Sequence, residues 1–168
     1  ARSYDLDAWS YENPYSLTFV APGNHGGLVL EPANARNVIS VAVADSAKNG
    51  SIWASSAHGP TEEGGRGIFM AAPGKSIVSA KGDGLKDSYN NESRVLTGTS
   101  MATPMASSYG AVLQQLIETE YIFILSGSLL RALMAISADT ITNDTPDSIQ
   151  GFGRPNLSSI VDIENGNM

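Results

Sequence analysis

The sequence predicts an α/β fold with a mainly parallel, twisted sheet and helices on both of its faces. Short runs rich in β-branched and other apolar residues recur along the chain, and residues 37–44 form the clearest of them. Two longer stretches, near residues 99–118 and 128–138, place apolar residues at helical spacing. Strands that alternate with helices in this way are typical of a three-layer arrangement in which helices cover a parallel sheet.

The N-terminal part of the chain predicts one helix followed by two strands. Residues 4–12 predict a short helix that ends before Pro14, because the residue preceding a proline disfavours helical backbone angles. Residues 17–20 predict a buried strand that runs into a turn at Gly23-Asn24. Residues 37–44 predict the second strand.

The rest of the chain predicts shorter strands, polar connections and two helices. Short strands are expected at three places: 68–72, 76–80 and 93–96. Polar or glycine-rich stretches predict exposed connections at four places: 45–51, 61–67, 82–92 and 143–150. The first helix is expected to begin around Thr99 and to end near Glu118, and the second is expected over 128–138.

Composition restricts the function without identifying it. The 168 residues with 42% hydrophobic content are enough for one compact domain. The formal net charge of −7 argues against a nucleic-acid partner, which requires a basic surface. No apolar run approaches the ~20 residues that a membrane helix needs, so no membrane partner is expected. The absence of cysteine excludes disulfides and thiol chemistry.

Residues 98–104, Gly-Thr-Ser-Met-Ala-Thr-Pro, place a hydroxyl side chain among small residues at the predicted start of a helix. Thr99 is a favourable N-cap residue, which puts Ser100 in the first turn. Backbone N–H groups of a first turn lack partners within the helix, and the positive end of the helix dipole lies there. A serine at this position could stabilise a negatively charged oxygen beside itself.

This run resembles the nucleophile motif of the subtilisin-like serine proteases, the subtilases, which is usually Gly-Thr-Ser-Met-Ala-x-Pro. Residues 17–26, Leu-Thr-Phe-Val-Ala-Pro-Gly-Asn-His-Gly, resemble the strand and turn that carry the oxyanion-hole asparagine of that family. Further segments are similar to subtilase segments in the same order: 37–43, 56–60, 72–74 and 151–157. The resemblance covers nearly the whole chain and implies that residues 1–168 form the C-terminal half of a subtilase catalytic domain.

The resemblance assigns roles to five residues. It implies that Ser100 is the nucleophile that forms an acyl-enzyme and that the Asn24 carboxamide donates a hydrogen bond in the oxyanion hole. It also implies that Ala21, Pro22 and Gly23 bind the substrate, which would be a protein or a peptide. No metal ligand is expected among the catalytic residues.

The histidine and aspartate of the subtilase triad come from segments N-terminal to the asparagine region, and these 168 residues contain neither segment. We therefore expect an N-terminal half of the same domain, as a cleaved segment or a separate chain, to supply both residues. The two histidines present, His25 and His58, lie at positions that the family does not use for catalysis.

Three departures from the family pattern keep a second hypothesis open. Met105 stands where a histidine usually follows the motif proline, and Ser107-Ser108 replace the usual Ala-Gly. Pro22 replaces a small residue and removes one backbone donor. The alternative to an active endopeptidase is therefore a catalytically inactive, subtilase-like binding or assembly module, either a pseudoprotease or a truncated half-domain.

The expected cofactor requirement and the expected location of the protein follow from the resemblance alone. The chemistry of a serine protease requires no cofactor. Calcium is common in subtilases, so structural calcium is possible, and a weak cation site formed by carbonyls around Ala33, Ala35 and Val38 is conceivable. The resemblance also implies an extracellular or secreted location.

Overall fold

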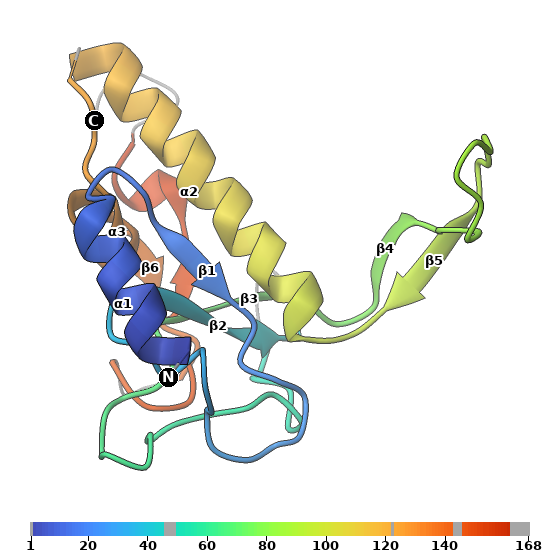
Figure 1. The fold of residues 1–168 in the computed structure, drawn as a ribbon, viewed down its shortest axis with the longest axis horizontal. Helices are drawn as coiled ribbons and strands as arrows, with labels where there is room; N and C mark the ends of the chain where they lie inside the picture. The colour runs from blue at the N-terminus through green and yellow to red at the C-terminus, as the bar shows by residue number, and fades with distance from the viewer. Residues whose placement is uncertain (1, 46–49, 122, 143–145, 162–168) are drawn as a thin grey trace.

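The computed structural model describes residues 2–45, 50–121, 123–142 and 146–161. Its centre is a three-stranded parallel sheet with the order β1-β2-β3 (Figure 1). The strands are β1 (Thr18–Val20), β2 (Val38–Ala44) and β3 (Met70–Pro73). The α/β class with a parallel sheet and helices is confirmed, and strand β2 matches its predicted range within one residue.

One face of the sheet is covered by the helices α2 (Thr99–Tyr121) and α3 (Gly127–Ile136). Successive side chains of a strand point to opposite faces, and alternate residues of β2 contribute to the core beneath the helices: Ile39, Val41 and Val43. Gly110 of α2 lets the helix lie close to β1, because a Cβ there would lie only 3.1 Å from the Phe19 ring. None of the described helices is long and apolar enough to cross a membrane.

The opposite face of the sheet packs against loops in the described part of the chain. Ala42 and Ala44 of β2 and Ala71 of β3 point to this side. They contact buried residues from the connections between strands: Val29, Ala33, Ala57 and Ile68. These small strand residues let the loops that follow β1 lie close to the sheet, which fixes the backbone that carries Asn24.

Helix α1 (Arg2–Glu12) lies at the amino end of β2 and has no buried residue. Its connection to the domain is polar. The two carboxylate oxygens of Asp7 accept hydrogen bonds from the backbone N–H groups of Arg36 (3.1 Å) and Asn37 (2.8 Å). Asp7 therefore anchors the helix to the backbone just before β2.

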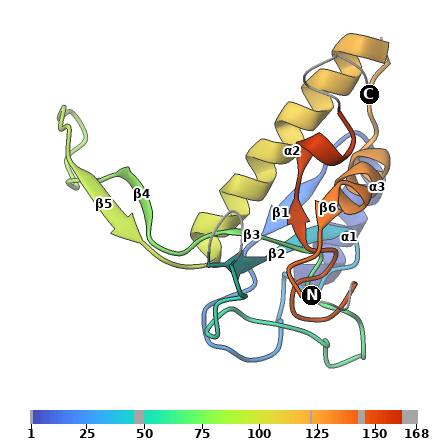
Figure 2. The same cartoon turned by 180° about the vertical axis from the view of Figure 1, so that it is seen from behind.

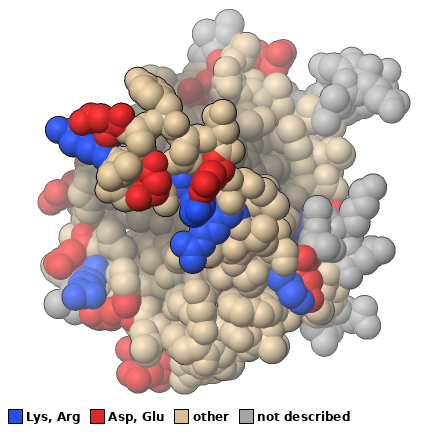
Figure 3. Space-filling model, turned by 90° about the vertical axis from the view of Figure 1, so that its right-hand side faces the viewer, with Lys and Arg blue, Asp and Glu red and all other residues tan. Residues whose placement is uncertain are grey.

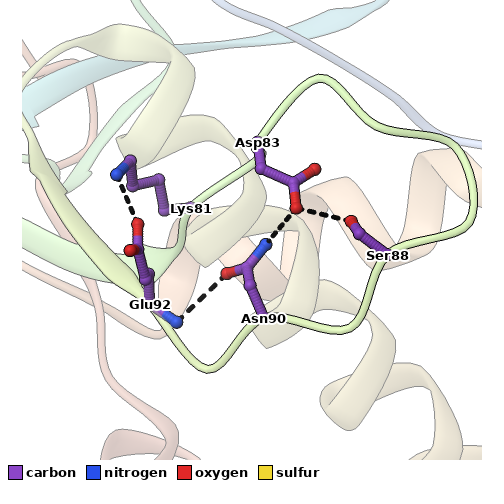
Figure 4. Close-up of polar contacts among 5 residues, drawn as sticks. All are labelled: Lys81, Asp83, Ser88, Asn90 and Glu92. Carbon is purple, nitrogen blue, oxygen red and sulfur yellow. Dashed lines mark hydrogen bonds and ion pairs between the residues drawn. The ribbon is translucent and has the colours of Figure 1, made fainter.

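Strands β4 (Ile77–Ala80) and β5 (Ser93–Leu96) form an antiparallel hairpin that projects from the domain (Figures 1 and 2). Acidic and basic side chains are interspersed on the side of the molecule viewed in Figure 3. Within the tip loop, Asp83 accepts hydrogen bonds from Ser88, Leu85 N–H and Asn90, and Lys81 pairs with Glu92 (Figure 4). The Ser88 hydrogen bond, followed by the other two, lowers the pKa of the Asp83 carboxyl. The predicted loop at 82–92 is thus ordered by local polar contacts.

The end of the chain returns to the sheet through β7 (Arg154–Pro155), which pairs with β6 (Ala138–Asp139) and precedes the 3₁₀ helix Leu157–Ser159. Backbone hydrogen bonds join this segment to the β3 region: Ala71 N–H to Gly153 O (2.9 Å) and Phe152 N–H to Phe69 O (2.8 Å). The predicted helix end at residue 138 is wrong by two residues. A strand of only two residues carries no alternation that sequence analysis could detect.

Substitution of Gly151 by alanine should strongly destabilise the assembled protein. The φ of Gly151 is +64°, and a Cβ there would lie 2.1 Å from the Phe69 carbonyl oxygen. Because the carbonyl oxygen belongs to the backbone and a Cβ is fixed rigidly to its own Cα, neither atom can turn aside and the segment would have to leave β3. We expect a loss of ~3 kcal/mol in the free energy of unfolding.

Gly84→Ala is the matched control. Gly84 also has a positive φ of +78°, but a Cβ there meets nothing within 4 Å. Only the conformational cost of ~1 kcal/mol should remain. Denaturant unfolding measures both variants, and equal losses would contradict the close contact between Gly151 and β3.

Candidate active site

Ser100 is the second residue of α2 and is exposed at the end of the helix that lies beside the end of β3. The first hydrogen bonds of the helix run from the N–H groups of Met101 (3.0 Å) and Ala102 (3.2 Å) to the Gly98 carbonyl. No described residue accepts a hydrogen bond from the Ser100 N–H. A free donor therefore lies on the same residue as the candidate nucleophile.

The prediction that Thr99 is the N-cap is wrong. Thr99 is the first residue of the helix, and the Gly98 carbonyl accepts the first helical bond. The Thr99 hydroxyl instead accepts a hydrogen bond from Gly23 N–H (3.3 Å) and donates one to Asn24 Oδ1 (3.1 Å). Thr99 therefore joins the start of α2 to the turn that follows β1.

The Asn24 carboxamide has a fixed orientation. Its Oδ1 also accepts a hydrogen bond from the Thr99 N–H at 2.8 Å. A backbone N–H can only donate, so the oxygen must face Thr99 and Nδ2 must face the other way. Within the described residues Nδ2 has no acceptor. The geometry thus leaves two unused donors, Asn24 Nδ2 and Ser100 N–H, on residues that Thr99 connects.

Two glycines make this close approach possible. A Cβ on Gly98 would lie 2.8 Å from Asn24 Nδ2, which is closer than real Cβ contacts. A Cβ on Gly74 would lie 2.8 Å from the Ala102 Cβ and from the Gly98 carbonyl. The Gly98 N–H donates to the Gly74 carbonyl at 2.9 Å. Only glycine at both positions lets the helix start rest directly on the end of β3.

Residues 54–58 support the Asn24 turn from outside, a contribution that sequence analysis missed. Backbone hydrogen bonds link the two segments at four points: Gly26 N–H to Ser55 O (2.8 Å), Ala57 N–H to Gly23 O (2.9 Å), His58 N–H to Gly27 O (2.9 Å) and Val29 N–H to His58 O (2.8 Å). The turn on both sides of Asn24 is therefore held by backbone groups whose positions do not depend on side-chain identity. The match of residues 56–60 to a subtilase segment therefore gave no indication of this contact, because the side chains do not make it.

Both histidines make contacts within this turn region. His25 Nδ1 accepts a hydrogen bond from the Gly27 N–H (3.1 Å). The ring nitrogens of His58 lie 2.6 Å from the Gly59 carbonyl oxygen and 3.2 Å from that of Gly26. In the described part of the chain neither ring is hydrogen-bonded to Ser100.

The predicted substrate-binding residues form the loop between β1 and Asn24. Pro22 is buried, whereas Ala21 and Gly23 are half-buried. The Gly23 N–H is engaged by Thr99, and Pro22 has none. Neither Pro22 nor Gly23 therefore offers a free main-chain donor to an extended peptide beside this segment.

Among the described residues, no three or more His, Asp or Glu side chains gather where they could hold a metal ion. What the arrangement offers chemically is an exposed hydroxyl with neighbouring neutral donors. Such a constellation suits a reaction in which a negatively charged oxygen forms next to the hydroxyl.

Three solved structures with the same fold are described as proteases. A lanthipeptide protease superposes with a TM-score of 0.76 at 18% identity, over 92% of this chain and 53% of its own. The prenylagaramide maturation protease PagA gives 0.72 at 25% identity, over 93% and 53%. The patellamide maturation protease PatA gives 0.72 at 28% identity, over 92% and 53%. The chain thus spans about half the length of these neighbours. No curated protein is similar enough in sequence to match.

The model of the subtilase family matches residues 4–153, a range that contains Asn24, Ser100 and all three strands of the parallel sheet. Because this match covers most of the sequence, the chain belongs to the subtilase family.

Proposed function

We propose that this chain is the nucleophile-bearing half of a serine endopeptidase in which Ser100 forms the acyl-enzyme and Asn24 contributes to the oxyanion hole. The observation that carries the proposal is the pair of hydrogen bonds from Thr99 to Asn24 Oδ1. They fix the carboxamide with its amino group free, next to a serine whose own N–H is free. A preorganised pair of neutral donors is what the developing oxyanion of acyl transfer requires.

In the proposed reaction, Ser100 Oγ attacks the carbonyl carbon of the scissile peptide bond and passes its proton to a histidine of the N-terminal half. The oxyanion of the tetrahedral intermediate accepts hydrogen bonds from Ser100 N–H and Asn24 Nδ2. As the intermediate collapses, the C–N bond breaks and the histidine returns the proton to the leaving amine. Water, deprotonated by the same histidine, then hydrolyses the ester on Ser100.

Two surfaces support docking of an N-terminal half that carries the aspartate and histidine. Strand β1 pairs only with β2 among the described strands, so its other edge has unpaired backbone groups. Helix α2 exposes apolar side chains near the nucleophile and beyond it, with Met105 48% and Val112 52% exposed. A segment that added strands beside β1 would cover the free edge of the sheet.

We propose a peptide precursor as the substrate class. PagA and PatA, at 25% and 28% identity, are both described as maturation proteases. The secreted location implied by the family resemblance stays a prediction.

Labelling of Ser100 by a fluorophosphonate separates an active enzyme from an inactive module. In the protein assembled with its N-terminal half, we expect one labelled serine, identified as Ser100 by peptide mass mapping, because only a serine next to a general base reacts. Ser100→Ala should lose both labelling and hydrolysis. Ser108→Ala, a change at an exposed serine further along the same helix, should keep both. An assembled parent protein that takes up no label would instead support the pseudoprotease hypothesis.

Removal of the Asn24 donor should lower kcat by ~10²–10³ with little change in KM, because the hydrogen bond forms fully only in the transition state. Asn24→Asp is the sharper variant, since a carboxylate keeps an acceptor for Thr99 but lacks the N–H donor. We expect steady-state kinetics to show a kcat loss for Asn24→Asp and Asn24→Ala alike. A rise in KM at unchanged kcat would remove Asn24 from the oxyanion hole.

Gly98→Ala should reduce kcat through Asn24. The added Cβ would force Nδ2 away from its position, and we expect a loss of ~10–10² in kcat. Gly82→Ala, where a Cβ meets nothing within 4 Å, should behave as the parent does. A double-mutant cycle tests whether the Gly98→Ala substitution lowers kcat by displacing the Asn24 carboxamide. If Gly98 acts by positioning the carboxamide, Gly98→Ala should cost little more activity in the Asn24→Ala background. Fully additive losses would rule out that route.

A further inference from the structure

Two imidazole rings contact the same peptide unit of the Asn24 turn. The unit joins Gly26 to Gly27, two and three residues after Asn24. The Gly27 N–H donates a hydrogen bond of 3.1 Å to His25 Nδ1. The Gly26 carbonyl oxygen lies 3.2 Å from His58 Nε2. One histidine therefore binds the donor of this unit, and the other binds its acceptor.

Main-chain hydrogen bonds use the outer groups of the two glycines and leave the inner ones to the rings. The Gly26 N–H donates to the Ser55 carbonyl at 2.8 Å. The Gly27 carbonyl accepts from the His58 N–H at 2.9 Å. Among the described residues, no main-chain group binds the Gly26 carbonyl or the Gly27 N–H. Since backbone polar groups of folded chains are nearly always paired, the two rings supply the partners that main-chain pairing lacks.

The His25 ring also fills the space beside two glycines of the turn. A Cβ on Gly23 would lie 3.1 Å from His25 Nε2, and a Cβ on Gly27 would lie 2.9 Å from His25 Nδ1. The ring therefore spans the turn from the residue before Asn24 to the third residue after it. A shift of the ring or of the Gly26–Gly27 unit would move the backbone that carries the Asn24 carboxamide.

These contacts require opposite protonation states of the two rings. His25 Nδ1 accepts a hydrogen bond, so it must have a free lone pair and the ring must be neutral. The His58 ring faces two carbonyl oxygens, that of Gly59 at 2.6 Å and that of Gly26 at 3.2 Å. Carbonyl oxygens only accept, and only the imidazolium form has an N–H on each ring nitrogen. A neutral His58 donates to the closer Gly59 carbonyl and leaves the Gly26 carbonyl without a donor.

No other titratable side chain belongs to the two segments that form this contact, residues 21–30 and 50–60. Residues 98–104, which pack against Asn24 at the start of α2, carry none either. The segments that pack against Gly59 carry four charged side chains: Glu62, Glu63, Arg66 and Asp147. In the described part of the chain, none of these four forms an ion pair or a hydrogen bond with either ring. The polar partners of both rings are therefore peptide groups.

We propose that His25 and His58 are positioning residues for the oxyanion donor Asn24, and that the Gly26–Gly27 unit is held on both sides only while His25 is neutral and His58 is protonated. This rests on the proposed function, because it gives the turn a part in kcat. Histidine is the side chain that changes its charge between about pH 5 and 8. Acid therefore releases the Gly27 N–H, and alkali releases the Gly26 carbonyl.

NMR spectroscopy tests the assignment of the two rings without any need for activity. The sample is the Ser100→Ala protein assembled with its N-terminal half, in which only this chain carries ¹⁵N-labelled histidine. The chain has two histidines, and the His25→Gln variant shows which signals belong to which ring. At high pH we expect the proton of His25 on Nε2 and that of His58 on Nδ1. A neutral ring with its proton on the other nitrogen, in either residue, would overturn the proposal.

The pH dependence of kcat in matched variants tests the positioning role. His25→Phe keeps a ring without an acceptor and should lower kcat ~5-fold at pH 8, the effect of one lost hydrogen bond, with KM unchanged. The ratio of parent kcat to variant kcat should approach one at pH 5, because the parent has then lost the same bond. Titration of the catalytic histidine cancels in this ratio. His25→Gln, whose Oε1 can accept from the Gly27 N–H at every pH, should match the parent at pH 8 and exceed it at pH 5.

His58→Phe should show the opposite trend. The ratio of parent kcat to His58→Phe kcat should rise toward acid, since only the protonated ring binds the Gly26 carbonyl. Ratios that do not change with pH for the two Phe variants would overturn the positioning role. Failure of the proposed function is recognised separately, because the assembled parent would then take up no fluorophosphonate label at Ser100, while the NMR signals would still decide the ring assignment.

Discussion

The hydrogen bond between the Thr99 N–H and Asn24 Oδ1 is the contact on which the rest of the site depends. It joins residues 75 positions apart, one in the turn after β1 and one at the start of α2. Its length of 2.8 Å requires the end of β3, the Gly98 backbone and the Asn24 turn to meet without any intervening side chain. The parallel sheet supplies that meeting point, because β1 and β3 both run toward it on either side of β2.

Sequence analysis predicted those parts of the fold that depend on local residue patterns. Residues 38–44 are apolar except for Ser40, and four of them are β-branched, which predicts a buried strand; all seven residues of β2 are buried. Helix α2 was predicted from the helical spacing of its apolar residues, although Pro104 lies within it. The short strands β6 and β7 escaped prediction, because their pairing depends on backbone groups brought together by the fold.

At the candidate site, the residues themselves were easier to predict from the sequence than the residues that they contact. Ser100 and Asn24 were identified from motif resemblance, but Thr99 was assigned to the wrong contact. A threonine before a helix is most often a cap, and only the arrival of the Asn24 turn gives its hydroxyl a different neighbour. In the same way, no local pattern distinguishes Arg131 from an ordinary surface residue of α3. Its guanidinium lies over the Phe69 ring and donates a hydrogen bond to the Arg36 carbonyl, and both of these partners come from distant segments.

Because Asn24 and Thr99 are far apart along the chain, the hydrogen bond that orients the Asn24 carboxamide can form only late in folding. The contacts of the β4–β5 hairpin are local, with Lys81 and Glu92 only 11 residues apart, and local contacts form early. The carboxamide can be oriented only after a far longer loop has closed, and the entropy of that closure must be offset by the packed sheet. A chain that is only partly folded therefore has its serine exposed but lacks one half of the donor pair. Under the proposed function, hydrolytic competence of the assembled enzyme is therefore a readout of completed folding, because the donor pair beside Ser100 exists only once the Asn24 turn has reached α2.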